Sequence, residues 1–348
     1  MACSIHGSTP ATADESKGFC PSLRDRRAVS LLGIFASAIL PVVGVAVVGF
    51  ALGRYEGVDP DPLNTITVYV LAPALVVHSL TTSELAGGTI VAVVVAVGVF
   101  TAGMLAVAEG VGRLWGHTEP FLGAFVLVSV FPNTGNYGIP LADFAFGATG
   151  RSVAVLVTAL QGVLLYTLGI YVAARGSGSD PLADMRRVFG VPLVYAVVAA
   201  LAVRWLGVVP PTESTLMQTL ELLGNASIPV MLLILGIQLS SVDAAGTLRP
   251  VGVASALKLL LAPLVAVGAV LATGAVVGFG NTTAARVVVL LLATPTGVTT
   301  LILVGAFSAS EGEVAPGEFV SATVFVTTVA SVLTVTVLVA ALQSGLLV

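Results

Sequence analysis

An apolar segment of this chain is interrupted by the run VFPNTGNYGIPLADFAFG, from Val130 to Gly147. Its Pro132 and Pro140 enclose two asparagines and two glycines, whereas a plain transmembrane helix needs no such interruption. The apolar residues 121–130 before it would form ~15 Å of helix, about half of a ~30 Å hydrocarbon core. We therefore expect a break near the bilayer midplane, where the freed backbone groups need partners inside the protein or in a watery cavity.

The composition indicates a polytopic, all-α membrane protein. Of 348 residues, 57% are hydrophobic and 9% are charged, and the mean hydropathy is +1.06; a soluble domain carries about 25% charged residues. Apolar segments long enough to span a bilayer predict ten transmembrane helices. They cover residues 29–52, 63–82, 86–108, 121–147, 152–174, 188–207, 215–239, 250–277, 284–308 and 318–344.

The expected organisation is a short tail followed by two five-helix halves. Residues 1–28 are polar and are expected to be a disordered tail, or a product of start-site choice. The halves are residues 29–174 and 188–348, joined by a short loop at 175–187. Cys3 and Cys20 both fall in the tail, so neither a disulfide framework nor a cysteine metal site is expected.

The second half echoes the first. ILPVVGVAVVGFALGR at 39–54 resembles GVPLVYAVVAALAVR at 190–204, Pro73 matches Pro229, and PNTG at 132–135 matches TPTG at 294–297. Five spans per half is an odd number, so the halves would insert in opposite orientations as an inverted repeat. The broken fourth and ninth spans would then cross at the centre, and their helix N-termini would favour an anion there.

These motifs resemble the auxin efflux carrier family, in its microbial permease branch. The resemblance is carried by PNTGNYGIPL, LGNASIPVMLLILGIQL (Leu223–Leu239), ALKLLLAP (Ala256–Pro263) and LLATPTGV (Leu291–Val298). It implies a five-plus-five inverted-repeat fold, shared with bile acid:sodium symporters, and an elevator-type alternating-access mechanism. Spans 1, 2, 6 and 7 would form a scaffold and a homodimer interface, while the other spans would carry the crossover.

The candidate substrate-binding residues lie in and around the two broken spans. Asparagine amides can donate to a carboxylate and also satisfy freed backbone groups, whereas threonines in apolar helices often bond to their own helix. The candidates are Asn133, Thr134, Gly135, Asn136, Gly138, Thr294, Thr296, Gly297, Thr299 and Lys258, with Pro132, Pro140 and Pro295 expected to set the breaks.

Ionisable groups inside predicted spans are costly and therefore functional candidates. Lys258 could neutralise an anionic substrate, or it could bond helix carbonyls and steady the crossover. Asp143 and Glu109 are candidate coupling residues, although Asp143 could also be a vestibule-facing acid and Glu109 could lie at a helix end. His78 is expected to be a packing residue.

The leading functional interpretation is a secondary transporter of small organic anions, with carboxylates as the expected class. The alternative is a sodium-coupled symporter of larger amphipathic anions. A channel filter sequence, the motifs HExxH and GxSxG, and a P-loop are absent from the sequence, so we expect no channel, no enzyme, no cofactor and no bound metal. The partners would be the substrate anion and the lipid bilayer, and no nucleic acid.

The orientation depends on whether the tail is counted. With residues 1–28 the basic residues are balanced between the two faces, and the positive-inside rule is undecided. Without the tail, the side of the membrane with the termini carries three basic residues and the opposite side carries six. The three are Arg151, Arg204 and Arg286, and the six are Arg54, Arg113, Arg175, Arg186, Arg187 and Arg249. This distribution predicts a cell-membrane protein with a cytoplasmic loop between the halves and extracellular termini.

Overall fold

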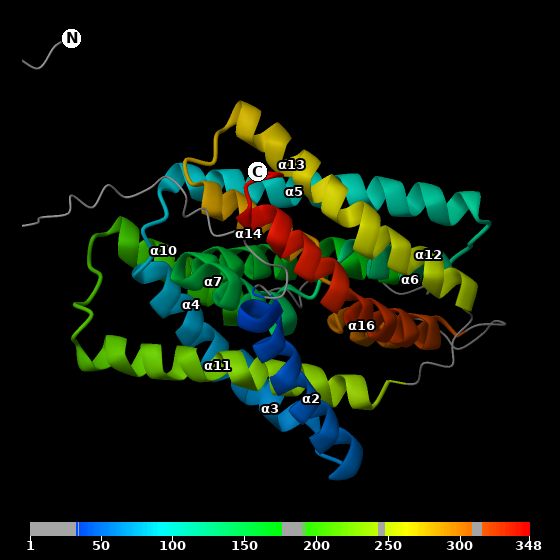
Figure 1. Cartoon of the computed structure of the whole chain (residues 1–348), viewed down its shortest axis with the longest axis horizontal. Coiled ribbons are helices and arrows are strands. Elements are labelled where there is room, and N and C mark those ends of the chain that lie inside the picture. Colours follow the sequence, from blue (N-terminus) through cyan, green and yellow to red (C-terminus); the bar gives the residue numbers. More distant parts are fainter. Residues whose placement is uncertain (1–32, 34, 176–189, 191, 243–247, 308–314) are drawn as a thin grey trace, which may run out of the picture.

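The computed structural model describes residues 33, 35–175, 190, 192–242, 248–307 and 315–348, and within these it contains helices and no strand (Figure 1). The expected tail at 1–28 and most of the loop at 175–187 lie outside the described residues. The α-helices are α2 (Leu40–Tyr55), α3 (Pro60–Ile66), α4 (Ala72–Thr81), α5 (Gly87–Leu114), α6 (Phe121–Val130), α7 (Ile139–Leu164), α8 (Ile170–Ala173), α10 (Pro192–Trp205), α11 (Thr215–Ser240), α12 (Leu248–Ala256), α13 (Ala262–Val276), α14 (Thr282–Leu292), α15 (Thr299–Phe307) and α16 (Pro316–Gln343). The π-helical turns are η1 (Phe35–Ile39), η2 (Thr67–Leu71), η3 (Thr134–Gly138), η4 (Leu165–Gly169) and η6 (Leu257–Leu261).

In the described residues, seven helices are long and apolar enough to cross a membrane, whereas the sequence predicts ten spans. These seven are Phe35–Tyr55, Pro60–Thr81, Gly87–Leu114, Thr134–Ala173, Thr215–Ser240, Arg249–Val276 and Pro316–Gln343. Three further apolar helices, Phe121–Val130, Pro192–Trp205 and Thr282–Leu292, are shorter and overlap the expected fourth, sixth and ninth spans. The counts also differ because Thr134–Ala173 joins the end of the expected fourth span to the fifth in one run of 40 residues.

The run Thr134–Ala173 bends sharply at Gly147, which has φ 63° and ψ −151°. Eight residues of straight helix would rise ~12 Å. However, Arg151 Nε donates to Asp143 Oδ1 at 2.8 Å, and Gly150 packs directly against the carbonyl of Ala142. The chain therefore turns back on itself at Gly147, close to the expected boundary between the fourth and fifth segments. Glycine suits this position because it adopts positive φ without a steric penalty.

Four of the π-helical turns precede a proline. The turns η1, η2, η3 and η6 each end two residues before Pro41, Pro73, Pro140 and Pro263, respectively. A proline inside a helix has no N–H and its ring clashes with the carbonyl four residues earlier. A wider turn accommodates that carbonyl, so the helix continues past the proline. Pro140 thus follows η3 at the start of α7, and the break itself lies at residues 131–133.

The helices form two packed groups with α7 between them. One group contains α2, α3, α4, α10 and α11, and the other contains α5, α6, α12, α13, α14 and α16. In Figure 1, α11, α2 and α3 lie along one side of the molecule and α5, α12 and α13 along the other. Glycines allow close approach in the first group, because Gly49 and Gly236 bring α2 and α11 into backbone contact.

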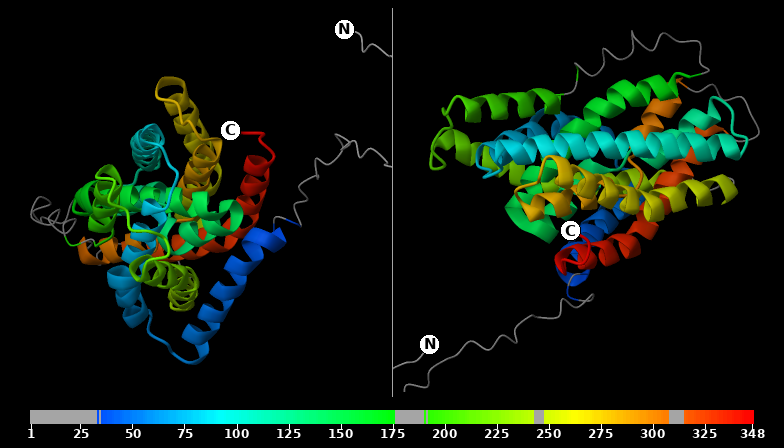
Figure 2. Two further views of the ribbon diagram at one scale, coloured as in Figure 1. Left: turned by 90° about the vertical axis from the view of Figure 1, so that its left-hand side faces the viewer. Right: turned by 90° about the horizontal axis from the view of Figure 1, so that it is seen from above.

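The short helices α6 and α14 occupy the interior. Residues 122–130 of α6 and 287–292 of α14 are all buried. The views in Figure 2 show longer helices around this centre. Both short helices end inside the protein, and this arrangement positions the candidate site.

Candidate functional site

Two helix interruptions meet at the centre of the protein. The first interruption, residues 131–133, separates α6 from η3, and the second, residues 293–298, separates α14 from α15. They pair through an antiparallel bridge between Pro132 and Thr296. The N–H of Asn133 donates to the carbonyl of Pro295 at 2.7 Å, and the N–H of Gly297 donates to the carbonyl of Phe131 at 3.0 Å. Each interruption thereby satisfies backbone groups that the other exposes.

Hydroxyl groups hold the paired interruptions in place. The Thr296 hydroxyl donates to the carbonyl of Val128 at 2.8 Å, and the Thr296 N–H donates to the hydroxyl of Thr327 on α16 at 3.2 Å. The Thr294 hydroxyl donates to the carbonyl of Leu291 at 2.7 Å. Thr294 and Thr296 therefore use their side chains to fix the backbone.

A cavity of about 240 Å³ lies beside the interruptions. Six of the predicted substrate-binding residues line it: Asn133, Thr134, Gly135, Asn136, Gly297 and Thr299. The remaining lining residues are Asn64, Thr67, Val68, Ala72, Phe131, Pro132, Ile139, Thr158, Gln161, Gly162, Leu165, Tyr166, Leu193, Met231, Gln238, Val298, Thr300 and Ile302. The cavity thus lies where α3, η2, α10 and α11 face the two interruptions.

Two helices begin at this cavity. The run η3–α7 begins at Thr134 and α15 begins at Thr299, and the first residues of both line the cavity wall. The first N–H groups of a helix have no carbonyl partner within the helix, and each N-terminus carries a partial charge of about +0.5. The two helix N-termini therefore place partial positive charge at the cavity wall.

Four buried polar atoms without a hydrogen-bond partner belong to cavity-lining residues. They are Asn133 Nδ2, Thr158 Oγ1, Gln161 Oε1 and Gln238 Oε1. A buried polar group without a partner costs about 1–3 kcal/mol, so an array of them in one cavity indicates a ligand or water that completes the bonds. The Gln161 amide nitrogen lies 3.5 Å from the hydroxyl of Thr101, so the amide oxygen of Gln161 can accept a hydrogen bond from a ligand.

The sequence alone did not identify Thr158, Gln161 or Gln238 as site residues. Thr158 and Gln161 lie three residues apart on α7, so they share a helix face. A search for polar pairs at helical spacing in otherwise apolar spans would have found them. Their distance from the first interruption in the sequence concealed the relationship, because the bend at Gly147 brings this part of α7 back to the cavity.

The other predicted substrate-binding residues lie away from the cavity wall. A Cβ on Gly138 would lie 2.7 Å from Leu291 Cδ2, so this glycine permits helix packing. Lys258 is fully buried, and its Nζ lies 3.5 Å from the carbonyl oxygens of both Val130 and Leu292.

The two candidate coupling acids are engaged in ion pairs outside the cavity. Asp143 binds Arg151 through contacts of 2.8 and 3.1 Å, and Arg151 also donates to Asn225 on α11 at 2.7 Å. Glu109 binds Arg113 at 2.7 Å and Arg175 at 2.9 Å. In the described part of the chain, no group of three or more His, Cys, Asp or Glu residues could hold a metal ion.

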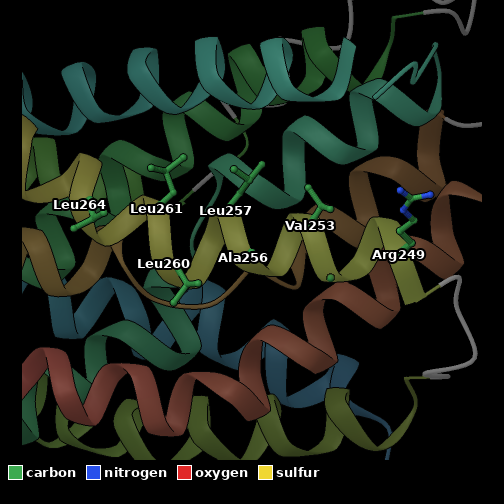
Figure 3. A pocket seen from close by; sticks show the side chains of 8 residues that line it. Arg249, Val253, Ala256, Leu257, Leu260, Leu261 and Leu264 are labelled. Atoms are coloured by element: carbon green, nitrogen blue, oxygen red, sulfur yellow. The ribbon is translucent and has the colours of Figure 1, made fainter. Parts of the chain in front are cut away.

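A second, larger hollow of about 620 Å³ follows a single helix run (Figure 3). It extends from Arg249 along Val253, Leu257 and Leu261 to Leu264. Leu264 is 69% exposed, as expected of a helix face that lies against lipid. Because Arg249 is the only polar side chain lining this hollow, the central cavity remains the candidate binding site.

Comparison with known proteins decides the family. Residues 34–339 match the membrane transport protein family. The chain belongs to this family. It is the auxin efflux carrier family that the sequence motifs resemble, so that expectation is confirmed.

Curated relatives of this transport family are microbial transporters. A protein named "Putative malonate transporter" from Rhizobium meliloti is 27% identical over 332 residues, which cover 89% of this chain and 96% of the relative. An uncharacterized transporter from Methanothermobacter thermautotrophicus is 24% identical over 66% of this chain and 76% of the relative. Another, from Methanocaldococcus jannaschii, is 28% identical over 51% of this chain and 59% of the relative's length. The chain is accordingly a multi-pass membrane protein of a transporter family.

Proposed function

We propose that this protein is a secondary carrier of small organic anions and that the anion binds in the central cavity. The observation that carries the proposal is the convergence of two helix N-termini and four unpartnered polar side-chain atoms on one cavity. Two N-termini at about +0.5 each offset roughly one carboxylate. The amide of Asn133 would donate to that carboxylate, and the oxygens of Gln161 and Gln238 would accept from hydroxyl or protonated acid groups.

The cavity size favours a small substrate. Its volume of about 240 Å³ is below the ~300–1,000 Å³ typical of sites for drug-sized ligands. The relative named as a malonate transporter points to short carboxylates. We therefore propose monocarboxylates, or dicarboxylates such as malonate in singly protonated form, because the N-termini alone offset one negative charge.

The proposed architecture is ten spans in an inverted five-plus-five repeat, with the interrupted spans crossing at the bridge between Pro132 and Thr296. In its support, the interruptions pair in antiparallel fashion and the chain reverses at Gly147. The group of α2, α3, α4, α10 and α11 would be the fixed scaffold and homodimer interface, and the group containing α6 and α14 would move as an elevator. The cavity between the groups would open alternately to each side.

Transport by purified protein in proteoliposomes tests this function. Vesicles preloaded with malonate, acetate, succinate or buffer would be supplied with radiolabelled malonate, with choline or sodium as the external cation. We expect counterflow into carboxylate-loaded vesicles with either cation. Strict sodium dependence and preference for bulky amphipathic anions would instead favour the sodium-coupled symporter, and no exchange of any carboxylate would refute the proposal.

The proposed location is the cell membrane with extracellular termini. In a cysteine-free background, a cysteine at exposed Ser344 should react with an impermeant maleimide added to intact cells. A cysteine at exposed Leu114, at the opposite end of α5 from Gly87, serves as the comparison, because that end is expected to face the cytoplasm. Labelling of the cysteine at position 114 but not of the cysteine at position 344 would show the opposite orientation.

A further inference from the structure

We propose that Lys258 is a resident cation that neutralises the C-terminal ends of both interrupted helices and takes the place of a coupling cation there. This inference rests on the proposed carrier function and adds the mode of ion coupling to it. Lys258 acts as a positioning residue, because it is not among the residues that line the cavity.

The position of the ammonium group is the first observation. Val130 is the last residue of α6 and Leu292 is the last residue of α14. Lys258 Nζ lies 3.5 Å from the carbonyl oxygen of each. The last carbonyl groups of a helix have no partner within the helix, so one ammonium group serves both helix ends.

The surroundings of Lys258 are the second observation. The side chain is fully buried, and Nζ lies 5.8 Å from the centre of the Phe100 ring. In the described residues Lys258 forms no ion pair with a carboxylate, and the acids Asp143 and Glu109 are paired with arginines. A buried lysine in a membrane protein is costly, so the two helix ends are the groups that compensate its charge.

The partial charges at the ends of the interrupted helices are then offset at both kinds of end, by Lys258 at the C-termini and by the substrate at the N-termini. Two C-termini at about −0.5 each offset one ammonium group, and two N-termini at about +0.5 each offset one carboxylate. Without Lys258, the C-terminal ends would repel an anion bound nearby. A bound sodium ion could supply the same positive charge, and Lys258 makes that ion unnecessary at this position.

Three Lys258 variants and one control test the inference in proteoliposomes. Lys258→Met removes the charge with similar volume, Lys258→Arg retains the charge, and Lys258→Ala removes both charge and volume. Arg249→Met is the matched control, because Arg249 lies at the start of the same helix run, over the Trp115 ring at 5.4 Å and away from the interruptions. Each variant is assayed for labelled malonate and acetate counterflow in sodium and in choline.

We expect sodium-independent uptake by the wild type and by Arg249→Met. Lys258→Met should lose about tenfold or more in uptake rate, and Lys258→Arg should recover part of it, since the charge at a helix end is the quantity removed. Malonate and acetate should be affected equally, because Lys258 acts on the helices and not on a second carboxylate. A loss confined to malonate would show direct substrate contact, and sodium dependence of the wild type would show that the lysine does not replace a coupling ion.

Thermal unfolding in detergent gives a second readout that needs no transport. Replacing an uncompensated buried charge by methionine generally stabilises a protein or leaves it unchanged. If Lys258 neutralises two helix ends, Lys258→Met should instead lower the melting temperature, with Lys258→Arg in between. If the wild type moves no carboxylate, the proposed function fails while this measurement still decides the role of Lys258. An unchanged or higher melting temperature for Lys258→Met would overturn the inference.

Discussion

The backbone N–H of Asn133 donates to the carbonyl oxygen of Pro295 at 2.7 Å, which joins the two helix interruptions through residues far apart in the chain. The reciprocal bond from Gly297 to Phe131 closes the pair. Two further bonds secure the same unit: the Thr296 hydroxyl donates to the carbonyl of Val128, and the Thr296 N–H donates to the hydroxyl of Thr327. The two interruptions are therefore fixed relative to each other, and any alternating-access motion should carry them as one body past α11.

Asn136→Ala should abolish most transport while the protein remains folded. Asn136 is half-buried and lines the cavity, where its amide can donate to a carboxylate. Loss of a hydrogen bond to a charged group costs about 1.5–3 kcal/mol, which corresponds to ~10–100-fold in uptake efficiency. Gln218→Ala on α11 is the control, because that amide donates to the carbonyl of Glu213 outside the cavity. Wild-type uptake by Asn136→Ala would remove this residue from the site.

Thr158→Val should separate function from stability. The Thr158 hydroxyl is buried without a partner, so removing it should leave the melting temperature unchanged or raise it, while substrate affinity falls. Thr167→Val is the matched control, since the Thr167 hydroxyl donates to the carbonyl of Val163 at 2.7 Å and does not line the cavity. Equal transport by both variants would indicate that Thr158 faces only water in the cavity.

Gly147→Ala should destabilise the protein, whereas Gly98→Ala should not. At φ 63° an alanine at position 147 is strained, and the expected cost is about 1 kcal/mol or more. Gly98 lies within α5 with open space around the site of a Cβ, where alanine favours the helix by ~0.5–1 kcal/mol. Melting temperatures in detergent measure both effects. A stable Gly147→Ala protein would contradict the tight turn.

The sequence was sufficient to predict the helix break and the residues of the first interruption that line the cavity. Pro132 and Pro295 remove N–H donors from apolar segments, and this local effect can be recognised without a structure. Asn133, Thr134 and Asn136 then follow from their position at the start of the next helix.

Other features depend on tertiary structure, and the sequence alone could not place them at the cavity. Thr158, Gln161 and Gln238 reach the cavity only because α7 turns back and packs near α11. The sequence placed Lys258 inside a predicted span, but that position does not distinguish the N-terminal from the C-terminal ends of the interrupted helices. The ten-span count also depends on tertiary structure, because the expected fourth and fifth spans meet directly at the bend at Gly147.

His117 should make stability depend on pH. It lies in the connection between α5 and α6, with its ring 4.8 Å from that of Phe121 and 5.3 Å from that of Phe125, and burial lowers its pKa below the usual 6.5. A lowered pKa means that the unfolded chain takes up the proton first. The stability contributed by neutral His117 is therefore full above pH 6.5 and is lost as the pH falls from there through the folded-state pKa.

Melting temperatures of the wild type and His117→Phe across this range provide the check. The wild type should lose stability below pH 6.5 while His117→Phe loses less. Glu119 acts in the opposite direction, because burial raises the pKa of its carboxyl and protonation at low pH then favours the folded state. The difference between the two proteins isolates His117, and parallel curves would contradict its assignment.

The Asp143–Arg151 pair should act as a clamp across the bend at Gly147. The two side chains are mostly buried, with 16% and 22% exposure, and Arg151 extends the link to Asn225 on α11. Removal of either partner leaves the other side chain charged, unpaired and partly shielded from water. This lowers the free energy of unfolding by about 1–3 kcal/mol. Asp143→Asn and Arg151→Gln should each lower the melting temperature, and the double variant should lose no more than the worse single variant.

Transport by the same variants distinguishes a clamp from a coupling residue. If Asp143 carried a proton or cation during transport, Asp143→Asn would change the pH or sodium dependence of uptake, and adding Arg151→Gln would not restore it. For a clamp, the double variant should recover activity relative to Asp143→Asn, because the unpaired arginine has been removed, and the ion dependence should match that of the wild type. Additive losses of stability, or an altered ion dependence in Asp143→Asn alone, would show that Asp143 does more than hold the bend.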